Sequence, residues 1–177
     1  SIRKMEVAGE LLATIFADLH PLMIVGNSTL YINNWIEKQL LAKGKRVGIV
    51  GGDHSTPFGA IQASLEQYPE MGILHIDAHA DLRDGYGGEH FSHAAALRRV
   101  MDHPISTLIS CGIRNISAGE IPYLEANQHR IKIHFAKDKR KWNAKEIVAP
   151  LKGRPVFVTF DLDGFDSSLM QATGTPE

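Results

Sequence analysis

The sequence predicts an α/β fold, a three-layer α/β/α sandwich around a mostly parallel central sheet. Short apolar runs rich in β-branched and aromatic residues alternate along the chain with longer segments of helical periodicity. The runs are continuously apolar, which is typical of parallel strands that helices cover on both faces. Strands and helices in alternation imply right-handed crossovers that place the strands in one sheet.

Each expected strand is justified by its composition and by the Gly, Pro or polar residues that bound it. In chain order the expected strands are Leu22–Val25, Arg46–Val50, Met71–Ile76, Thr107–Cys111, Ile131–Phe135 and Pro155–Phe160. Each expected helix is justified by apolar residues that recur with the period of a helix. The expected helices are Met5–Leu19, Leu30–Leu41, Phe58–Tyr68, His93–Met101, Glu120–Ala126 and Ala144–Leu151.

Length and composition indicate one globular domain without a nucleic-acid or membrane partner. The chain has 177 residues, 44% of them hydrophobic, and a formal net charge of −1. This balance offers no basic face for nucleic acid or an anionic membrane, and no apolar stretch reaches the roughly 18 residues of a spanning helix. The lone cysteine, Cys111, excludes an internal disulfide, so we expect a reducing, cytoplasmic location.

Carboxylates and imidazoles follow three of the expected strands. The motifs are GGDHS at 51–55, DAHAD at 77–81 and DLDGFD at 161–166. Open α/β sheets hold their sites at the carboxyl ends of the strands, so we expect the three motifs to meet. A single Asp-x-Asp or Asp-x-His is most often a turn or a cap. Three such motifs at three strand ends favour a metal centre instead.

Spacing within the motifs selects the candidate ligands. They are His54, Asp77, His79, Asp81, Asp161 and Asp163. Alternate residues of an extended backbone point to one side, so the three polar residues of DAHAD share a face, as do the first two acids of DLDGFD. Carboxylates packed this closely raise one another's pKa values unless cations neutralise them. Four carboxylates and two imidazoles suit two hard or borderline ions such as Mn²⁺ better than a structural zinc.

Together with ATGTP at 172–176, the three motifs resemble, in the same order, the signatures of the ureohydrolases, the arginase and agmatinase family. The resemblance implies two Mn²⁺ per chain, with Asp77 and Asp161 bridging them. The other ligands would be His54 and Asp81 for one ion, and His79 and Asp163 for the second. Two further acids of the motifs would orient loops and ligands: Asp53 and Asp166.

The same resemblance implies hydrolysis of a guanidino C–N bond. A water whose pKa two divalent cations bring toward neutrality would attack the guanidinium carbon, and the leaving amine would depart with a proton, giving urea. Asp163 would accept the first proton and pass it on. His93, in FSH at 91–93, resembles the family's mobile active-site histidine; the alternative is a residue that starts a helix. His75, inside an expected strand, is expected to be a hydrogen-bonded core residue.

Substrate choice depends on the segment that follows DAHAD. Arginases typically carry an asparagine where this chain has Arg83, so we expect a small guanidino substrate without the α-carboxylate. Agmatine, giving urea and putrescine, comes first; arginase, guanidinobutyrase and formimidoylglutamase activities are the alternatives. Glu89 and Asp84 are candidates to attract the distal positive charge of agmatine, or else solvate a loop.

Two other classes stay open at this point. A one-metal, deacetylase-like amide hydrolase would also use an Asp-x-His pair, although the additional acids favour two metals. An inactive fragment is the other class, because family members continue beyond Thr175-Pro176 and begin before Ser1. We therefore expect one ureohydrolase domain over residues 1–177, truncated at both ends, from a family that assembles as trimers or hexamers.

Overall fold

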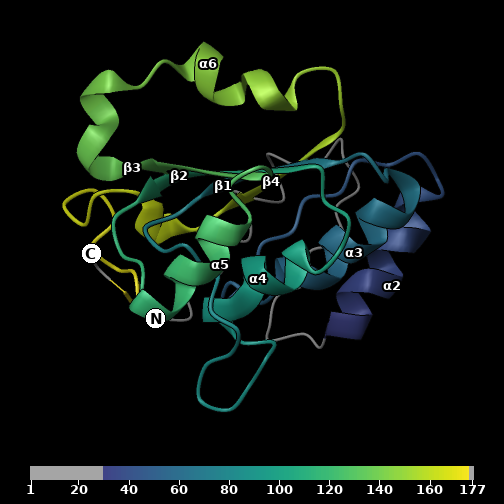
Figure 1. Ribbon diagram of the computed structural model, residues 1–177. Helices are drawn as coiled ribbons and strands as arrows, with labels where there is room; N and C mark the ends of the chain where they lie inside the picture. The colour runs from purple at the N-terminus through teal and green to yellow at the C-terminus, as the bar shows by residue number, and fades with distance from the viewer. Residues whose placement is uncertain (1–29, 176–177) are drawn as a thin grey trace.

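The computed structural model describes residues 30–175, which form a four-stranded parallel sheet between layers of helices (Figure 1). The strands are β1 (Gly72–Ile76), β2 (Thr107–Ile113), β3 (Ile131–Phe135) and β4 (Val156–Phe160). Their order in the sheet is β3-β2-β1-β4, and every pair is parallel. The predicted α/β sandwich is confirmed. None of the helices in the described range is long and apolar enough to cross a membrane.

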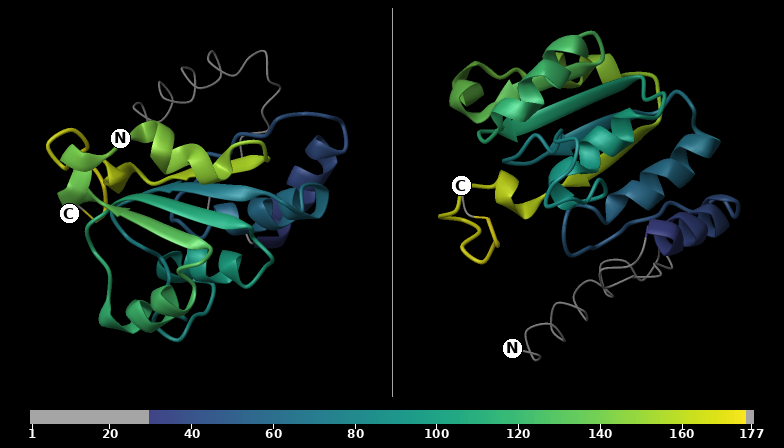
Figure 2. Two further views of the ribbon diagram at one scale, coloured as in Figure 1. Left: turned by 45° about the horizontal axis from the view of Figure 1, so that its top comes forward. Right: turned by 60° about the horizontal axis from the view of Figure 1, so that its bottom comes forward.

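The helices lie on both faces of the sheet. They are α2 (Leu30–Leu41), α3 (Pro57–Gln67), α4 (Ala96–Met101), α5 (Ile121–Ala126) and α6 (Ala144–Val148). Short 3₁₀ helices extend or connect them at His93–Ala95, Ala118–Glu120, Ala136–Lys141, Ala149–Leu151 and Leu162–Gly164. Helix α6 covers one face, while α3, α4 and α5 lie on the other and α2 packs against α3 (Figures 1 and 2).

Side chains of the strands are buried toward both helical layers. Ile73 of β1 and Leu108 of β2 are paired in register and pack with α3 and α4 in the larger core. The next pair in register, Leu74 and Ile109, faces the opposite way and packs with Ile147 of α6. Strands that bury alternate residues on opposite faces need apolar residues at nearly every position, which explains the continuous apolar runs.

The helix starts follow local sequence rules. Pro57 lies in the first turn of α3, where the missing N–H leaves no hydrogen bond unmade. Ser117 and Glu120 form a capping box before α5, in which each side chain bonds the other's backbone N–H. The Asn143 side chain accepts a hydrogen bond from the Lys145 amide at the start of α6.

One expected strand is wrong, and two expected elements, Met5–Leu19 and Leu22–Val25, lie outside the described residues. Arg46–Val50 is irregular and joins no ladder within residues 30–175. This segment and β4 line a common cleft of about 1070 Å³, and no ladder joins their backbones. An apolar run becomes a strand only where a neighbour's N–H and C=O groups come within reach. The described sheet therefore has four strands instead of about six.

Strand β4 forms one edge of the described sheet. Its ladder partner is β1. Val156, Val158 and Phe160 point to the same face as Leu74, the face that α6 covers farther along the sheet. Their exposures of 40%, 56% and 43% show that α6 does not reach this edge.

Candidate metal centre

The carboxyl ends of β1 and β4 open into a polar cleft of about 530 Å³. Most of its acidic and imidazole residues come from the three motifs that sequence analysis selected. These lining residues are Asp53, His54, Asp77, His79, Asp81, His93, Glu120, Asp161 and Asp163. All six predicted ligands therefore meet at one edge of the sheet.

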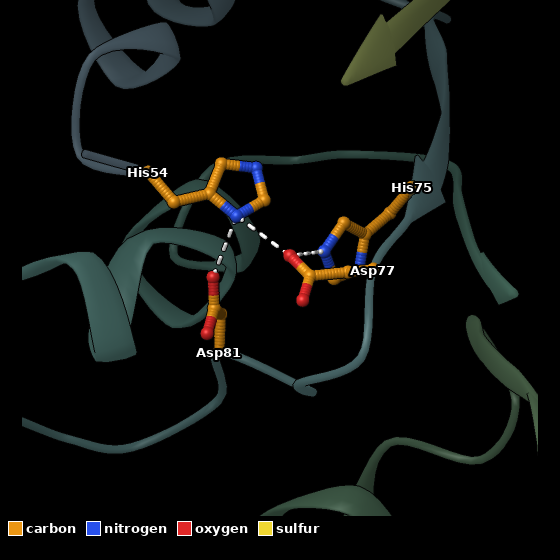
Figure 3. A group of neighbouring side chains, drawn as sticks. All are labelled: His54, His75, Asp77 and Asp81. Atoms are coloured by element: carbon orange, nitrogen blue, oxygen red, sulfur yellow. Dashed lines mark hydrogen bonds and ion pairs between the residues drawn. The ribbon is translucent and has the colours of Figure 1, made fainter. Parts of the chain in front are cut away.

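The first group of side chains is centred on His54, in the loop before α3. Its Nδ1 atom lies 2.7 Å from Oδ2 of Asp77 and 2.8 Å from Oδ2 of Asp81 (Figure 3). Oδ2 of Asp161, at the end of β4, is 3.6 Å away from the same nitrogen. Three carboxylates thus converge on one imidazole nitrogen.

The second group is centred on His79. Its Nδ1 atom lies 3.1 Å from Oδ2 of Asp163 and 3.5 Å from Oδ1 of Asp77. These three residues offer ligand atoms close enough together to hold a metal ion, as do the four residues around the first group, His54, His75, Asp77 and Asp81. Asp77 belongs to both groups and presents a different oxygen to each.

The backbone after β1 keeps the predicted alternation. Asp77, His79 and Asp81 all line the cleft, whereas Ala78 is fully buried and does not. Asp81 has a φ of 53°, a left-handed conformation that aspartate adopts more readily than most residues. The extended segment therefore ends in a turn at the last acid of the motif.

Two glycines allow neighbouring chain segments to pack directly against the Asp77 backbone. A Cβ atom on Gly112, in β2, would lie 2.9 Å from the Asp77 carbonyl oxygen, and φ at Gly112 is 97°. A Cβ atom on Gly164 would lie 3.0 Å from the Asp77 nitrogen. Both positions need glycine because a side chain would displace the residue that joins the two groups.

Burial and neighbouring charges shift the pKa values of the site. Burial alone would lower the pKa of His54, but the carboxylates of Asp77 and Asp81 outweigh it and raise the pKa to about 10. Burial would raise the pKa of Asp77, but the surrounding imidazoles of His54, His75 and His79 hold it well below its usual range. Opposite charges within hydrogen-bond reach explain both directions.

Asp161 differs from the other acids. Burial raises its pKa, the Asp163 amide opposes this shift, and the charges of Asp77 and Asp163 add to it. The Asp163 amide donates to Oδ1 of Asp161 at 3.1 Å, which fixes the orientation of that carboxylate. Like charges this close favour a site that takes up a cation.

The donor set fits divalent metal ions. Nδ1 of His54 is buried and makes no properly directed hydrogen bond, although carboxylate oxygens lie at 2.7 and 2.8 Å. A buried nitrogen with converging carboxylate oxygens provides ligands for a cation. Asp77, Asp81 and Asp163 are each at least nine-tenths buried, and positive charge is needed to offset the burial of such carboxylates.

Three further residues line the cleft beside the acids: Arg83, Tyr86 and His93. His93 is the first residue of a 3₁₀ helix and also lines the cleft. The two alternatives from the sequence, a site residue and a residue that starts a helix, are therefore compatible. The Tyr86 ring lies 5.6 Å from the His93 ring and 5.3 Å from the Arg83 guanidinium carbon. The Tyr86 ring therefore contacts both residues at the rim of the cleft.

Neither acid expected to attract a distal positive charge lines the cleft. The Asp84 carboxylate instead lies 2.8 Å from an Arg99 nitrogen of α4, and this contact lowers its pKa. Glu89 is exposed, and its backbone pairs with that of Tyr86 in a small hairpin. The alternative reading of Asp84 and Glu89, as loop residues, matches their position.

Several polar residues at the site were not selected from the sequence, among them Thr175, Arg114 and Asn115. The Thr175 hydroxyl donates to Oδ2 of Asp163 at 2.8 Å, and the Arg114 guanidinium donates to the Asp163 carbonyl at 2.7 Å. Asn115 lines the cleft. A signal existed for each, since Thr175 belongs to ATGTP and the Arg114-Asn115 pair directly follows an apolar strand.

The remaining predicted residues lie around the site. Oδ1 of Asp53 accepts a hydrogen bond from the Ser55 amide, and Oδ1 of Asp166 accepts one from the Ser168 amide, each at 2.9 Å. Both contacts fix a local turn. His75 is fully buried and hydrogen-bonded on both ring nitrogens, as expected of a core residue.

Comparison with known sequences gives one consistent family. A sequence model of the arginase family matches residues 13–177. The agmatinase of Bacillus subtilis is 35% identical over 140 residues, which cover 77% of this chain and 46% of the relative. The guanidino acid hydrolase of Homo sapiens is 30% identical over 149 residues, which cover 79% and 42%. The chain spans about half the length of the curated relatives it matches.

Solved structures agree with the sequence matches. The agmatine ureohydrolase of Thermoplasma volcanium superposes with a TM-score of 0.71 at 25% identity, over 84% of this chain and 50% of that one. The proclavaminate amidino hydrolase of Streptomyces clavuligerus gives 0.73 at 25% identity, over 84% and 52%. An arginase from Bacillus caldovelox, at 23% identity and 0.73 over 84% and 56%, shares the fold.

Proposed function

Because the chain belongs to the arginase family, we propose that the protein is a binuclear manganese ureohydrolase that converts agmatine to urea and putrescine. The observation that carries this proposal is the position of Asp77. One of its oxygens faces His54 and the other faces His79. A carboxylate shared in this way can bridge two ions, as a two-metal centre requires.

We assign the ligands from the two groups. One ion would be held by His54, Asp77, Asp81 and Asp161, and the other by Asp77, His79, Asp161 and Asp163. Carboxylate and imidazole donors without a thiolate support Mn²⁺. When bound, two divalent cations supply the positive charge that brings the pKa of a water toward neutrality.

The remaining chemistry belongs to the side chains of the cleft. Asp163 holds a proton at its carboxylate during the reaction, and its two oxygens are kept in place by the Ala78 amide and the Thr175 hydroxyl. His93, at the rim of the same cleft, delivers a proton to the leaving amine.

A second candidate substrate follows from Arg83. This residue replaces the asparagine typical of arginases, and its guanidinium group lines the cleft beside Tyr86. A cation at the rim favours a substrate whose far end is a carboxylate, such as 4-guanidinobutyrate. The agmatinase relatives support agmatine, whereas a guanidinobutyrase relative supports the second candidate.

Product analysis separates the candidates. The Mn²⁺-loaded protein is incubated with agmatine, arginine or 4-guanidinobutyrate, and urea and amine products are measured. We expect urea and putrescine from agmatine, far slower turnover of arginine, and no turnover after the metal is removed with a chelator. Arginine turnover equal to that of agmatine would contradict the agmatinase proposal. A preference for 4-guanidinobutyrate that Arg83→Gln abolishes would favour the second candidate.

Metal counting tests the number of ions. Two ions per chain support the binuclear site, whereas one ion per chain supports the deacetylase-like alternative. Assembly into trimers or hexamers and a cytoplasmic location stay predictions from the family resemblance.

A further inference from the structure

We propose that Ser110 and His75 form a positioning pair that holds the Asp77 carboxylate in the orientation needed to bridge two ions. This inference rests on the proposed function, since it concerns the affinity of the site for metal. His75 is not a ligand in this proposal. It acts on the metal through Asp77.

The contacts form a chain from the neighbouring strand to the site. The Ser110 hydroxyl lies 3.0 Å from Nδ1 of His75. Nε2 of His75 in turn lies 2.9 Å from Oδ2 of Asp77 (Figure 3). An ionised carboxylate only accepts hydrogen bonds, so Nε2 donates to Asp77. Nδ1 of the neutral ring then accepts from the Ser110 hydroxyl. Both nitrogens are therefore used, and one tautomer satisfies every contact.

The sheet makes this arrangement rigid. His75 of β1 and Ser110 of β2 are paired in register, so their side chains leave the same face of adjacent strands. Exposures of 0% for His75 and 1% for Ser110 leave neither side chain room to rotate toward solvent. The pair therefore presents a fixed donor to the carboxylate.

The position of His75 explains why it acts behind the metal site and not in it. His75 does not line the cleft, whereas Asp77, His54 and Asp81 do. Figure 3 shows Asp77 between His75 and His54. Histidine and carboxylate are the usual partners around metal sites, and loss of such an outer partner typically costs 10- to 100-fold in metal affinity. In the usual arrangement histidine binds the metal and a carboxylate supports the histidine. Here the carboxylate of Asp77 is the proposed ligand, and His75 supports it.

Three variants test the pair by Mn²⁺ binding isotherms. His75→Leu is expected to raise the Kd for Mn²⁺ about 10- to 100-fold, and Ser110→Ala to raise it by a smaller factor. His75→Gln keeps a donor for Asp77 and is expected to remain within about threefold of the parent protein. A Kd that none of the three substitutions changes would overturn the proposal.

Ser64→Ala serves as the matched control. Ser64 is also buried, and its hydroxyl donates to Glu37 away from the cleft that holds the predicted ligands. This variant is expected to lower the free energy of unfolding without changing the Kd for Mn²⁺. If Ser110→Ala lowers the free energy of unfolding as much as Ser64→Ala does and leaves the Kd for Mn²⁺ unchanged, Ser110 has only a structural role and the proposal fails. If His75→Leu does not fold, Ser110→Ala and His75→Gln still decide.

A measurement on the metal-free protein separates this inference from the proposed function. Nitrogen NMR of the histidine rings is expected to show the His75 proton on Nε2. A proton on Nδ1 would contradict the pair even if the parent protein binds two ions. Conversely, a parent protein that binds no Mn²⁺ would refute the proposed metal centre while the NMR result still tests the contact.

Discussion

Nδ1 of His54 lies 2.7 Å from Oδ2 of Asp77, and this contact joins the loop before α3 to the end of β1. The same ring reaches β4, since its Nε2 atom lies 2.8 Å from the Thr159 hydroxyl. Arg46–Val50, just before this loop, joins no ladder in the described part of the chain. Side-chain contacts of His54 therefore attach the GGDHS motif to the sheet, and metal binding and attachment of this loop are linked.

Replacing the shared carboxylate is expected to remove both ions. Asp77→Ala takes one ligand from each group, so metal analysis should find fewer than one ion per chain. Asp138→Ala is the control, because the Asp138 side chain pairs with Lys141 of its own 3₁₀ helix and does not line the cleft. Circular dichroism verifies that both variants fold. Two ions retained in Asp77→Ala would refute the bridging assignment.

The close approach at Gly164 gives a second test. In Gly164→Ala the new methyl group would lie 3.0 Å from the Asp77 nitrogen and 3.1 Å from its Cα atom, so the backbone must shift. We expect a loss of about 1–3 kcal/mol of stability, the usual cost of overpacking, together with reduced metal content. Gly119→Ala meets no atom within 4 Å and should change neither quantity. Denaturant unfolding and metal analysis of both variants provide the comparison.

His93 is expected to affect turnover without affecting metal content. Loss of a positioned proton donor costs about 10²- to 10⁴-fold in rate, so His93→Ala should lower kcat by this order while retaining two ions. His90→Ala is the neighbouring control, since the His90 ring contacts the Asp84 carbonyl of its own loop. Equal rates for the two variants would show that His93 only starts its helix.

Glu37 predicts a pH dependence of stability. Burial raises the pKa of this carboxyl group against the lowering effect of the Ser64 hydroxyl, and Oε2 lacks a hydrogen-bond partner. Because the pKa of Glu37 is higher in the folded protein, Glu37 contributes fully to the free energy of unfolding below its unfolded pKa of about 4.5. That contribution is lost as the pH rises through the folded value. Glu37→Gln should therefore be more stable than the parent at pH 8.

The advantage of Glu37→Gln should shrink as the pH falls below about 4.5, where the glutamic acid is neutral in both states. Thermal unfolding of the two proteins across this range is the measurement. A difference in stability between Glu37→Gln and the parent protein that stays constant at every pH would mean that the substitution acts through packing and not through charge.

Much of the site was predictable because its signals are local. Alternation in DAHAD depends on backbone geometry alone, and it correctly placed Asp77, His79 and Asp81 on one side. The strand ends were equally readable, since β1 and β4 carry continuous apolar runs. Parallel strands then bring their carboxyl ends together without further information from the sequence.

The features that the sequence did not predict depend on interactions that only the folded chain creates. Arg46–Val50 has the composition of a strand but lacks a neighbour within reach. Asp84 has the charge to attract an amine but is already paired with Arg99. Gly112 and Gly164 carry no chemical signal, and their importance comes from close contact with Asp77. Each case depends on a partner distant in the sequence.

The exposed edge at β4 has a practical consequence for handling the protein. Val156, Val158 and Phe160 present an apolar surface beside backbone groups that no ladder occupies in the described range. Such an edge pairs readily with strands of other molecules. The apparent molecular mass from light scattering should therefore rise with protein concentration, and Val158→Lys should suppress that rise.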